Sequence, residues 1–213
     1  MDTRVKICGL NTPDAVAASV EAGAGYLGFV FFPKSPRNVD VATARRLALD
    51  VPVGVAKVAL VVDPTDAELE RITGDVPVDM IQLHGKESLE RVTEVRTRFG
   101  LPVMKAVGVS GPADLQALNA YGMVADQVLV DAKAPKGADL PGGNGLAFDW
   151  RLISKRGWNA PWMLAGGLTP DNVALACQMT GAKQVDVSSG VERAPGIKDP
   201  AKIHAFIAAI RAA

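Results

Sequence analysis

Short runs of β-branched and other apolar residues alternate along the chain with longer stretches in which apolar residues recur at helical spacing. The runs predict strands, and the stretches between them predict amphipathic helices. Thr12 before Pro13 and Thr169 before Pro170 are each typical of a helix start, and Gly23 is typical of a helix end. The predicted strands cover residues 4–8, 26–31, 53–62, 79–84, 101–109, 126–132, 161–166 and 183–189.

This alternation repeats eight times, which predicts an α/β fold built from parallel βαβ units. Eight such units favour a single-domain (β/α)8 TIM barrel over residues 1–213. With about 27 residues per unit (213 divided by eight), no unit has room for a large inserted domain. The alternative is an open doubly wound sheet, which the lack of a G-x-G-x-x-G pattern after the first predicted strand disfavours.

Composition narrows the classes of partner. Lys and Arg number 23 and Asp and Glu also 23, so no net charge attracts nucleic acid or an anionic membrane surface. No apolar run approaches the roughly 20 residues of a membrane span, and no signal peptide is expected at the start. Cys8 and Cys177 are too few for a disulfide framework, and His84 and His204 are far apart. We therefore expect a cytoplasmic protein that binds a small molecule and has no metal site.

In a barrel of this kind, ligands bind at the carboxyl ends of the strands, where several polar residues occur. Side chains two positions apart share a face of a strand. Such pairs are Lys6 with Cys8, Gln82 with His84, Leu129 with Asp131, and Asp186 with Ser188. If these faces point inward, the polar groups converge on one cavity, where burial is costly unless they are paired or used. Gln82, His84 and Asp186 are therefore candidate substrate-binding residues.

Cys8 and Asp131 would place a thiol and a carboxylic acid across the mouth of the barrel from each other. A base and an acid held apart in this way suit an isomerisation by proton transfer. A thiol of ordinary pKa is mostly protonated at neutral pH, so a neighbouring cation such as Lys6 would have to assist. The alternatives are that Cys8 is a small core residue and that Asp131 caps a loop.

The segments "LAGGLTPDNV" and "VDVSSGVE" place glycines and hydroxyl residues after the last two predicted strands, where we expect helix N-termini. Backbone N–H groups freed by glycine, serine hydroxyls and a helix dipole together favour a phosphate group. Simple turn geometry is the alternative for either segment alone. The candidate phosphate-binding residues are Gly166, Gly167, Ser188, Ser189 and Gly190.

Two further loops follow predicted strands. The proline-punctuated segment 31–38 carries Arg37, whose planar guanidinium suits a carboxylate, although a solvated surface arginine is the common alternative. Residues 131–150 form a long glycine-rich segment directly after the candidate acid. Loops of this length are usually lids or binding loops, and disorder is the alternative.

Taken together, six segments in order and in register resemble phosphoribosylanthranilate isomerases of tryptophan biosynthesis over nearly the whole chain. They are "KICGL", "GFVFFPKSPRNV", "IQLHG", "LVDA" with "GGNGLAFDW", "LAGGLTPDNV" and "VDVSSGVE". The resemblance implies that Cys8 is the general base, that Asp131 is the general acid and that Arg37 holds the anthranilate carboxylate. It implies that the glycines and serines of the last two segments hold the phosphate. Small departures are "VALVVD" and the Asn144 of "GGNG".

The reaction implied by this resemblance is the Amadori rearrangement of N-(5-phosphoribosyl)anthranilate to 1-(2-carboxyphenylamino)-1-deoxyribulose 5-phosphate, without a cofactor. Two other functions stay open on the residues alone. One is a phosphosugar lyase or aldolase that forms a Schiff base with an inward-facing Lys6 or Lys105. The other is a barrel that only binds a phosphorylated metabolite. The sequence is compatible with a monomer and with an isologous homodimer.

Overall fold

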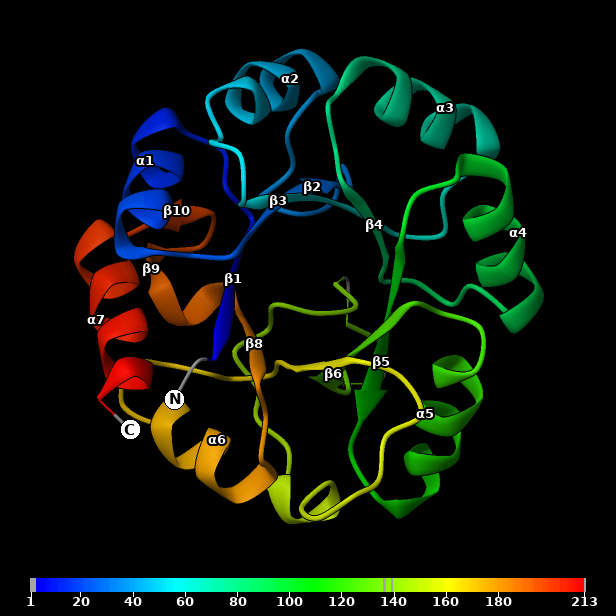
Figure 1. Ribbon diagram of the computed structural model, residues 1–213, viewed down its shortest axis with the longest axis vertical. Coiled ribbons are helices and arrows are strands. Elements are labelled where there is room, and N and C mark those ends of the chain that lie inside the picture. The colour runs from blue at the N-terminus through cyan, green and yellow to red at the C-terminus, as the bar shows by residue number, and fades with distance from the viewer. Residues whose placement is uncertain (1–2, 136, 139, 213) are drawn as a thin grey trace.

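Eight parallel strands close into a barrel in chain order, and the helices surround it (Figure 1). The computed structural model describes residues 3–135, 137–138 and 140–212. The predicted (β/α)8 barrel is thereby confirmed. The strands are β1 (Arg4–Cys8), β2 (Tyr26–Phe31), β3 (Ala56–Val61), β4 (Met80–Leu83), β5 (Val103–Val109), β6 (Gln127–Ala132), β7 (Trp162–Leu164) and β8 (Gln184–Val187).

Closure of the barrel joins β1 to β8, and this register places Lys6 beside Asp186. Most strands are shorter than the apolar runs that predicted them. The run 53–62 begins as a turn, in which Gly54 has a φ of 97° and Val53 is fully exposed. The left-handed backbone at Gly54 cannot continue a strand, so β3 starts only at Ala56.

The helices outside the barrel are α1 (Pro13–Ala22), α2 (Val41–Leu49), α3 (Asp66–Asp75), α4 (Leu89–Phe99), α5 (Leu115–Gly122), α6 (Val173–Thr180) and α7 (Pro200–Arg211). The Thr12 hydroxyl accepts a hydrogen bond from the N–H of Ala15, which confirms the predicted start of α1. The predicted start at Thr169 is wrong. The Asn172 side chain accepts from the N–H of Thr169 and donates to the carbonyl of Gly167, and this turn delays α6 until Val173.

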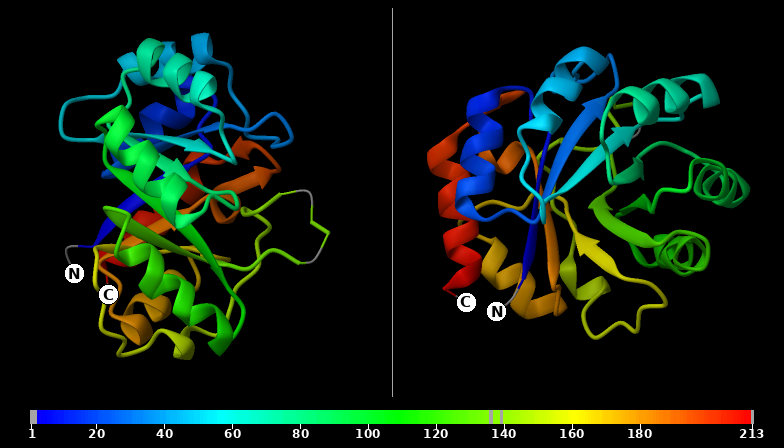
Figure 2. Two further views of the ribbon diagram at one scale, coloured as in Figure 1. Left: turned by 90° about the vertical axis from the view of Figure 1, so that its right-hand side faces the viewer. Right: turned by 45° about the horizontal axis from the view of Figure 1, so that its top comes forward.

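The sixth unit also differs from the predicted alternation. In the described part of the segment between β6 and β7 there is no α-helix, and only a single 3₁₀ turn, η2 (Trp150–Leu152), precedes β7. The glycines and prolines of the long loop after β6 disfavour a helix there. In the left view of Figure 2 this loop projects from the face opposite the start of β1 and the end of α7.

Alternating positions of the strands divide the core into two layers. Residues between the strands and the helices form the larger apolar cluster, which includes Ile7, Leu27, Phe29, Ile81 and Val130. The barrel interior is filled by Tyr26, Val58, Met104, Leu129 and Met163, above which lies a small cluster of Cys8, Val30 and Leu60. Among the helices of the described ranges, none has the length and apolar character needed to cross a bilayer.

Candidate active site

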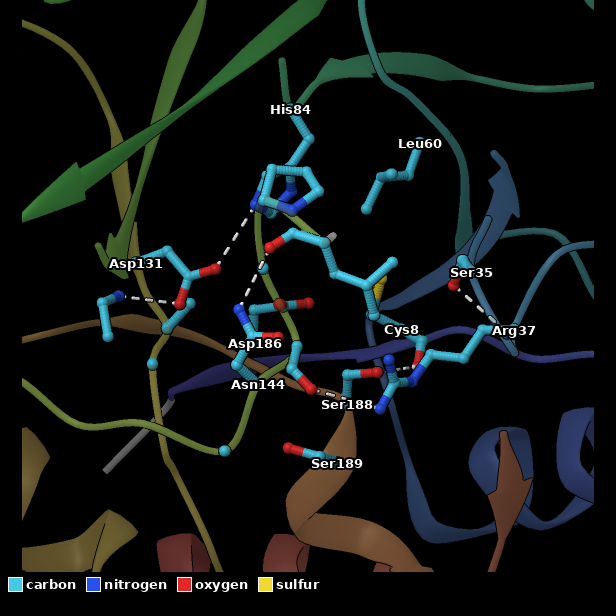
Figure 3. A pocket seen from close by; sticks show the side chains of 18 of the residues that line it. Cys8, Ser35, Arg37, Leu60, His84, Asp131, Asn144, Asp186, Ser188 and Ser189 are labelled. Carbon is cyan, nitrogen blue, oxygen red and sulfur yellow. Dashed lines mark hydrogen bonds and ion pairs between the residues drawn. The ribbon is translucent and has the colours of Figure 1, made fainter. Parts of the chain in front are cut away.

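A cavity opens at the carboxyl ends of the strands, above the apolar interior of the barrel (Figure 3). Most of the predicted site residues line it, namely Cys8, Arg37, His84, Asp131, Gly166, Gly167, Asp186, Ser188 and Ser189. Gln82 and Gly190 do not line it. The cavity therefore brings together the thiol, the carboxylic acid, the arginine and the two glycine- and serine-containing segments that the sequence placed at separate strand ends.

Cys8, at the end of β1, is both packed and directed toward the cavity. It is 3% exposed and lies with Val30 and Leu60 in the small cluster beneath the opening. A Cβ atom on Gly28 of the neighbouring strand would stand 3.0 Å from the Cys8 Sγ and 3.1 Å from the Lys6 Nζ. A larger residue there would crowd both groups. Burial raises the pKa of the Cys8 thiol, and the charge of Lys6 opposes that effect.

Lys6 is a fixed cation beside this thiol. Its Nζ is fully buried and lies 2.8 Å from the Oδ1 of Asp186. Burial alone would lower the pKa of Lys6, but the interactions of its Nζ with Asp186 and Cys8 together outweigh burial and raise that pKa to about 12. An amine held in its charged form is a poor nucleophile, so the ion pair disfavours the Schiff-base reaction at Lys6.

Lys105 does not reach the cavity, so the expectation of an inward-facing lysine on β5 is wrong. It shares the outer face of the strand with Val103 and Val107. Its Nζ donates to the Oε2 of Glu87 and to the carbonyl of Gly85, each at 2.8 Å. Lys105 thus ties the loop after β4 to the outside of the barrel.

Asp131, at the end of β6, is held at both oxygens. Its Oδ1 accepts from the N–H of Ala132 at 2.8 Å, and its Oδ2 lies 3.3 Å from the Nε2 of His84. The other ring nitrogen of His84 lies 3.0 Å from the Nε2 of Gln82. Gln82 is fully buried and does not line the cavity, and its side-chain amide contacts the imidazole of His84.

Arg37 is buried rather than solvated. Its Nε lies 2.7 Å from Glu192 Oε1, and its Nη2 lies 2.9 Å from Glu192 Oε2. Burial alone would raise the pKa of Glu192, but Arg37 and Lys198 hold it below its ordinary value. Sequence reasoning missed Glu192 and Lys198 because charged residues in a loop are usually solvated. The short hairpin of β9 (Glu192–Ala194) and β10 (Ile197–Lys198) buries them here.

The two candidate phosphate-binding segments lie side by side. Gly166 and Gly167 have φ values of 86° and 63°, and the Ser188 hydroxyl donates to the Cys8 carbonyl at 3.0 Å. A Cβ atom on Gly190 would stand 1.9 Å from the Leu168 carbonyl oxygen, so Gly190 allows close packing of the two loops instead of lining the cavity. Ser189 begins a 3₁₀ turn, η3 (Ser189–Val191), and not the α-helix that the sequence predicted at this point.

The long loop after β6 covers part of the cavity, as a lid would. Its residues 140–146 line the cavity, and Asn144 donates a hydrogen bond to the carbonyl of Leu140. A Cβ atom on Gly142 would stand 2.5 Å from His84 Nε2, and one on Gly143 would stand 2.8 Å from Arg37 Nη1. These glycines let the lid backbone approach the acid and the arginine closely.

Comparison with known proteins identifies the family of this barrel. The family model described as N-(5'phosphoribosyl)anthranilate (PRA) isomerase matches residues 5–209. An N-(5'-phosphoribosyl)anthranilate isomerase of Cereibacter sphaeroides is 64% identical over 208 residues, which cover 98% of each chain.

Two solved structures are also similar. The crystal structure of phosphoribosyl anthranilate isomerase from Thermotoga maritima has a TM-score of 0.89 and 36% identity, and covers 99% of this chain and 100% of that chain. A phosphoribosyl anthranilate isomerase in complex with reduced 1-(o-carboxyphenylamino)-1-deoxyribulose 5-phosphate has a TM-score of 0.84 and 34% identity, with the same coverage. The chain belongs to the N-(5'-phosphoribosyl)anthranilate isomerase family.

Proposed function

We propose that Cys8 and Asp131 of this isomerase catalyse the Amadori rearrangement of N-(5-phosphoribosyl)anthranilate in tryptophan biosynthesis. The observation that carries the proposal is that a thiol from β1 and a carboxyl group from β6 face one cavity, which two glycine- and serine-containing loops border (Figure 3). Family membership supports the same reaction, as does the related isomerase whose structure holds a reduced form of the product.

The first step is ring opening. Protonated Asp131 donates its proton to the furanose ring oxygen, the bond between that oxygen and C1′ breaks, and the nitrogen lone pair forms an iminium ion with C1′. His84 lies beside the carboxyl group and fixes its direction. The iminium ion makes the hydrogen on C2′ acidic, so the substrate itself provides the electron sink and no cofactor is required.

In the second step, the Cys8 thiolate removes the hydrogen on C2′. The electron pair of that C–H bond forms a C1′–C2′ double bond and neutralises the nitrogen. The resulting enolamine takes up a proton at C1′ and the C2′ hydroxyl gives up its proton, which yields the ketone. The reaction therefore moves hydrogen and changes no composition. Lys6 assists because its positive charge favours the thiolate against the effect of burial.

We assign the substrate's two anionic groups to two separate subsites of the cavity. Arg37 faces the anthranilate carboxylate, because a guanidinium matches the geometry of a carboxylate. The backbone at Gly166 and Gly167 and the hydroxyls of Ser188 and Ser189 surround the phosphate. Both subsites line the same cavity as Cys8, which supports this orientation of the sugar between them.

The test is to supply the purified protein with phosphoribosylanthranilate and to follow the loss of its fluorescence. Cys8→Ala and Asp131→Asn should each lower kcat by roughly 10²-fold or more, the usual effect of losing an acid–base group. Cys177→Ala is the matched control, because Cys177 is a buried cysteine on α6 that does not line the cavity. Wild-type turnover in either variant would remove that residue from the mechanism, and trapping of a lysine adduct by borohydride would favour the Schiff-base alternative.

We further propose that residues 1–213 act as one catalytic domain, as a monomer or an isologous homodimer. Both cysteines are free thiols, in keeping with a reducing cytoplasm.

A further inference from the structure

The Glu192 carboxylate connects the arginine of one loop to the serine-containing segment of another. Its two oxygens accept from the Nε and Nη2 of Arg37 at 2.7 and 2.9 Å, and Oε1 also accepts from the Nζ of Lys198 at 2.7 Å. The N–H of Gly196 donates to Oε2 at 3.2 Å. The Glu192 side chain is only 4% exposed, so these partners replace its hydration almost completely.

Lys198 extends this network to the proposed phosphate subsite. Its side chain is fully buried, and its Nζ donates to the carbonyl of Ser188 at 3.0 Å and lies 3.2 Å from the Ser188 hydroxyl. Ser188 in turn donates to the Cys8 carbonyl. A continuous chain of contacts therefore runs from Arg37 through Glu192 and Lys198 to Ser188.

The geometry leaves one edge of Arg37 for a ligand. Glu192 occupies Nε and one side of Nη2, and the carbonyl of Gly143 lies 3.3 Å from Nη2. Nη1 has no hydrogen-bond acceptor among the described residues, although Arg37 lines the cavity. Two buried basic side chains, Arg37 and Lys198, share the single carboxylate of Glu192, and burial lowers the pKa of Lys198. The guanidinium of Arg37 is therefore the positive charge that this group presents at the cavity.

We propose that Glu192 and Lys198 are positioning residues that determine specificity for a carboxylated substrate, because they hold Arg37 with its Nη1 edge toward the substrate carboxylate. This inference rests on the proposed function. A flexible arginine side chain loses rotamer entropy when its guanidinium binds a ligand. A bidentate partner such as Glu192 already fixes the side chain in the free protein, so this entropy loss no longer opposes ligand binding. The carboxylate of Glu192 thus acts through Arg37 and not on the reacting atoms.

The experiment compares two substrates, the phosphoribosyl adduct of anthranilate and that of aniline, which lacks the carboxylate. Glu192→Gln keeps the shape of the side chain but removes its charge and half of its acceptors. Glu192→Gln should lower the specificity ratio, which is kcat/KM for the anthranilate adduct divided by kcat/KM for the aniline adduct, by about tenfold or more. This is the effect expected when a charge-assisted hydrogen bond is lost. The loss should lie in KM for the anthranilate adduct, and kcat/KM for the aniline adduct should change little.

A double-variant cycle tests whether Glu192 acts through Arg37. Arg37→Lys should lower the same ratio, and Arg37→Lys with Glu192→Gln should lower it no further than Arg37→Lys alone. Lys198→Met is a second variant, and it keeps the ion pair of Arg37 and Glu192. Unlike Glu192→Gln, it does not leave Arg37 and Lys198 buried without a carboxylate. It should give a smaller loss of the ratio. Lys202→Met is the matched control, because the Nζ of Lys202 donates to the backbone carbonyl of Glu192 and not to its carboxylate.

The outcomes separate the two levels of the proposal. An equal fall of kcat/KM for both substrates in Glu192→Gln and Lys198→Met, or additive losses in the double variant, would overturn the positioning role while the proposed function stands. Failure of the wild-type protein to convert either adduct would overturn the proposed function itself. Selective loss on the anthranilate adduct, without additivity, supports the inference.

Discussion

The Nε2 atom of His84 lies 3.3 Å from the Oδ2 of Asp131, and the Nδ1 of the same ring lies 3.0 Å from the Nε2 of Gln82. If the Gln82 amide donates to Nδ1, the proton of the neutral ring lies on Nε2 and points at the carboxyl group. If the Gln82 amide is rotated so that its oxygen faces the ring, Nδ1 carries the proton and donates it to that oxygen. Nε2 then accepts a hydrogen bond from protonated Asp131. The Gln82 carboxamide oxygen, which has no partner among the described groups, is available for that second arrangement.

We therefore predict that His84→Ala lowers kcat by about tenfold or more with a smaller change in KM, because the acid loses its orienting partner. Gln82→Leu should lower kcat less, since the imidazole stays beside Asp131. Steady-state kinetics on phosphoribosylanthranilate measures both. A higher KM with unchanged kcat in His84→Ala would instead show that His84 binds substrate in the ground state.

The second prediction concerns Lys6 and the ionisation of Cys8. Burial raises the pKa of the Cys8 thiol, so the thiolate fraction and kcat/KM should both increase as pH rises above neutrality. Lys6→Met removes the cation that opposes burial and leaves the negative Asp186 near the sulfur. The acidic limb of the kcat/KM profile should therefore move to higher pH, and the rate at pH 7 should fall.

Two measurements check this prediction. The pH profile of kcat/KM reports the reacting enzyme, and the rate of Cys8 alkylation in a Cys177→Ala background reports the thiolate directly. Asp186→Asn added to Lys6→Met should move both profiles part of the way back, because it removes the negative charge that Lys6 had balanced. Profiles that coincide in wild type and Lys6→Met would exclude an electrostatic role for Lys6.

The strands and most strand-end residues could be predicted from the sequence because a buried parallel strand is a short apolar run, and a polar residue at its end stands out. The orientation of the Lys105 side chain could not be predicted from the sequence. Alternation shows that Lys105 and Val107 share a face, but both faces of a barrel strand are buried, so the pattern does not say which one points inward. Glu192 and Lys198 could not be predicted either, because they are buried in a short hairpin whose contact with Arg37, 155 residues away from Glu192, leaves no local pattern in the sequence.

The third prediction concerns stability away from the cavity. Glu87 is 5% exposed, accepts from the N–H groups of Asp63 and Gly85, and pairs with the buried Lys105. Lys105→Met leaves that carboxylate without its cation, so the free energy of unfolding should fall by about 3–5 kcal/mol. Denaturant titration at pH 7 measures the loss.

The double variant Lys105→Met with Glu87→Gln distinguishes a charge effect from a packing effect. Removing both charges avoids the unpaired carboxylate, so the double variant should lose less stability than the sum of the two single variants. Additive losses would mean that the ion pair itself contributes little and that packing around β5 and the loop after β4 carries the stability.

The fourth prediction concerns the approach of the lid to the acid. Gly142 does not have a left-handed φ, so alanine there causes no backbone strain, but its Cβ would stand 2.5 Å from His84 Nε2 and 2.7 Å from Asp131 Oδ2. Gly142→Ala should therefore hold the lid away from the cavity and lower kcat/KM by about tenfold or more, because an open lid admits water and leaves the site incomplete. The thermal midpoint should be unchanged, since the lid adds no core contact at this position.

Gly157→Ala is the matched control, because a Cβ there meets nothing within 4 Å. Wild-type kcat/KM in Gly142→Ala would show that turnover does not require the lid backbone to approach the histidine and the acid this closely.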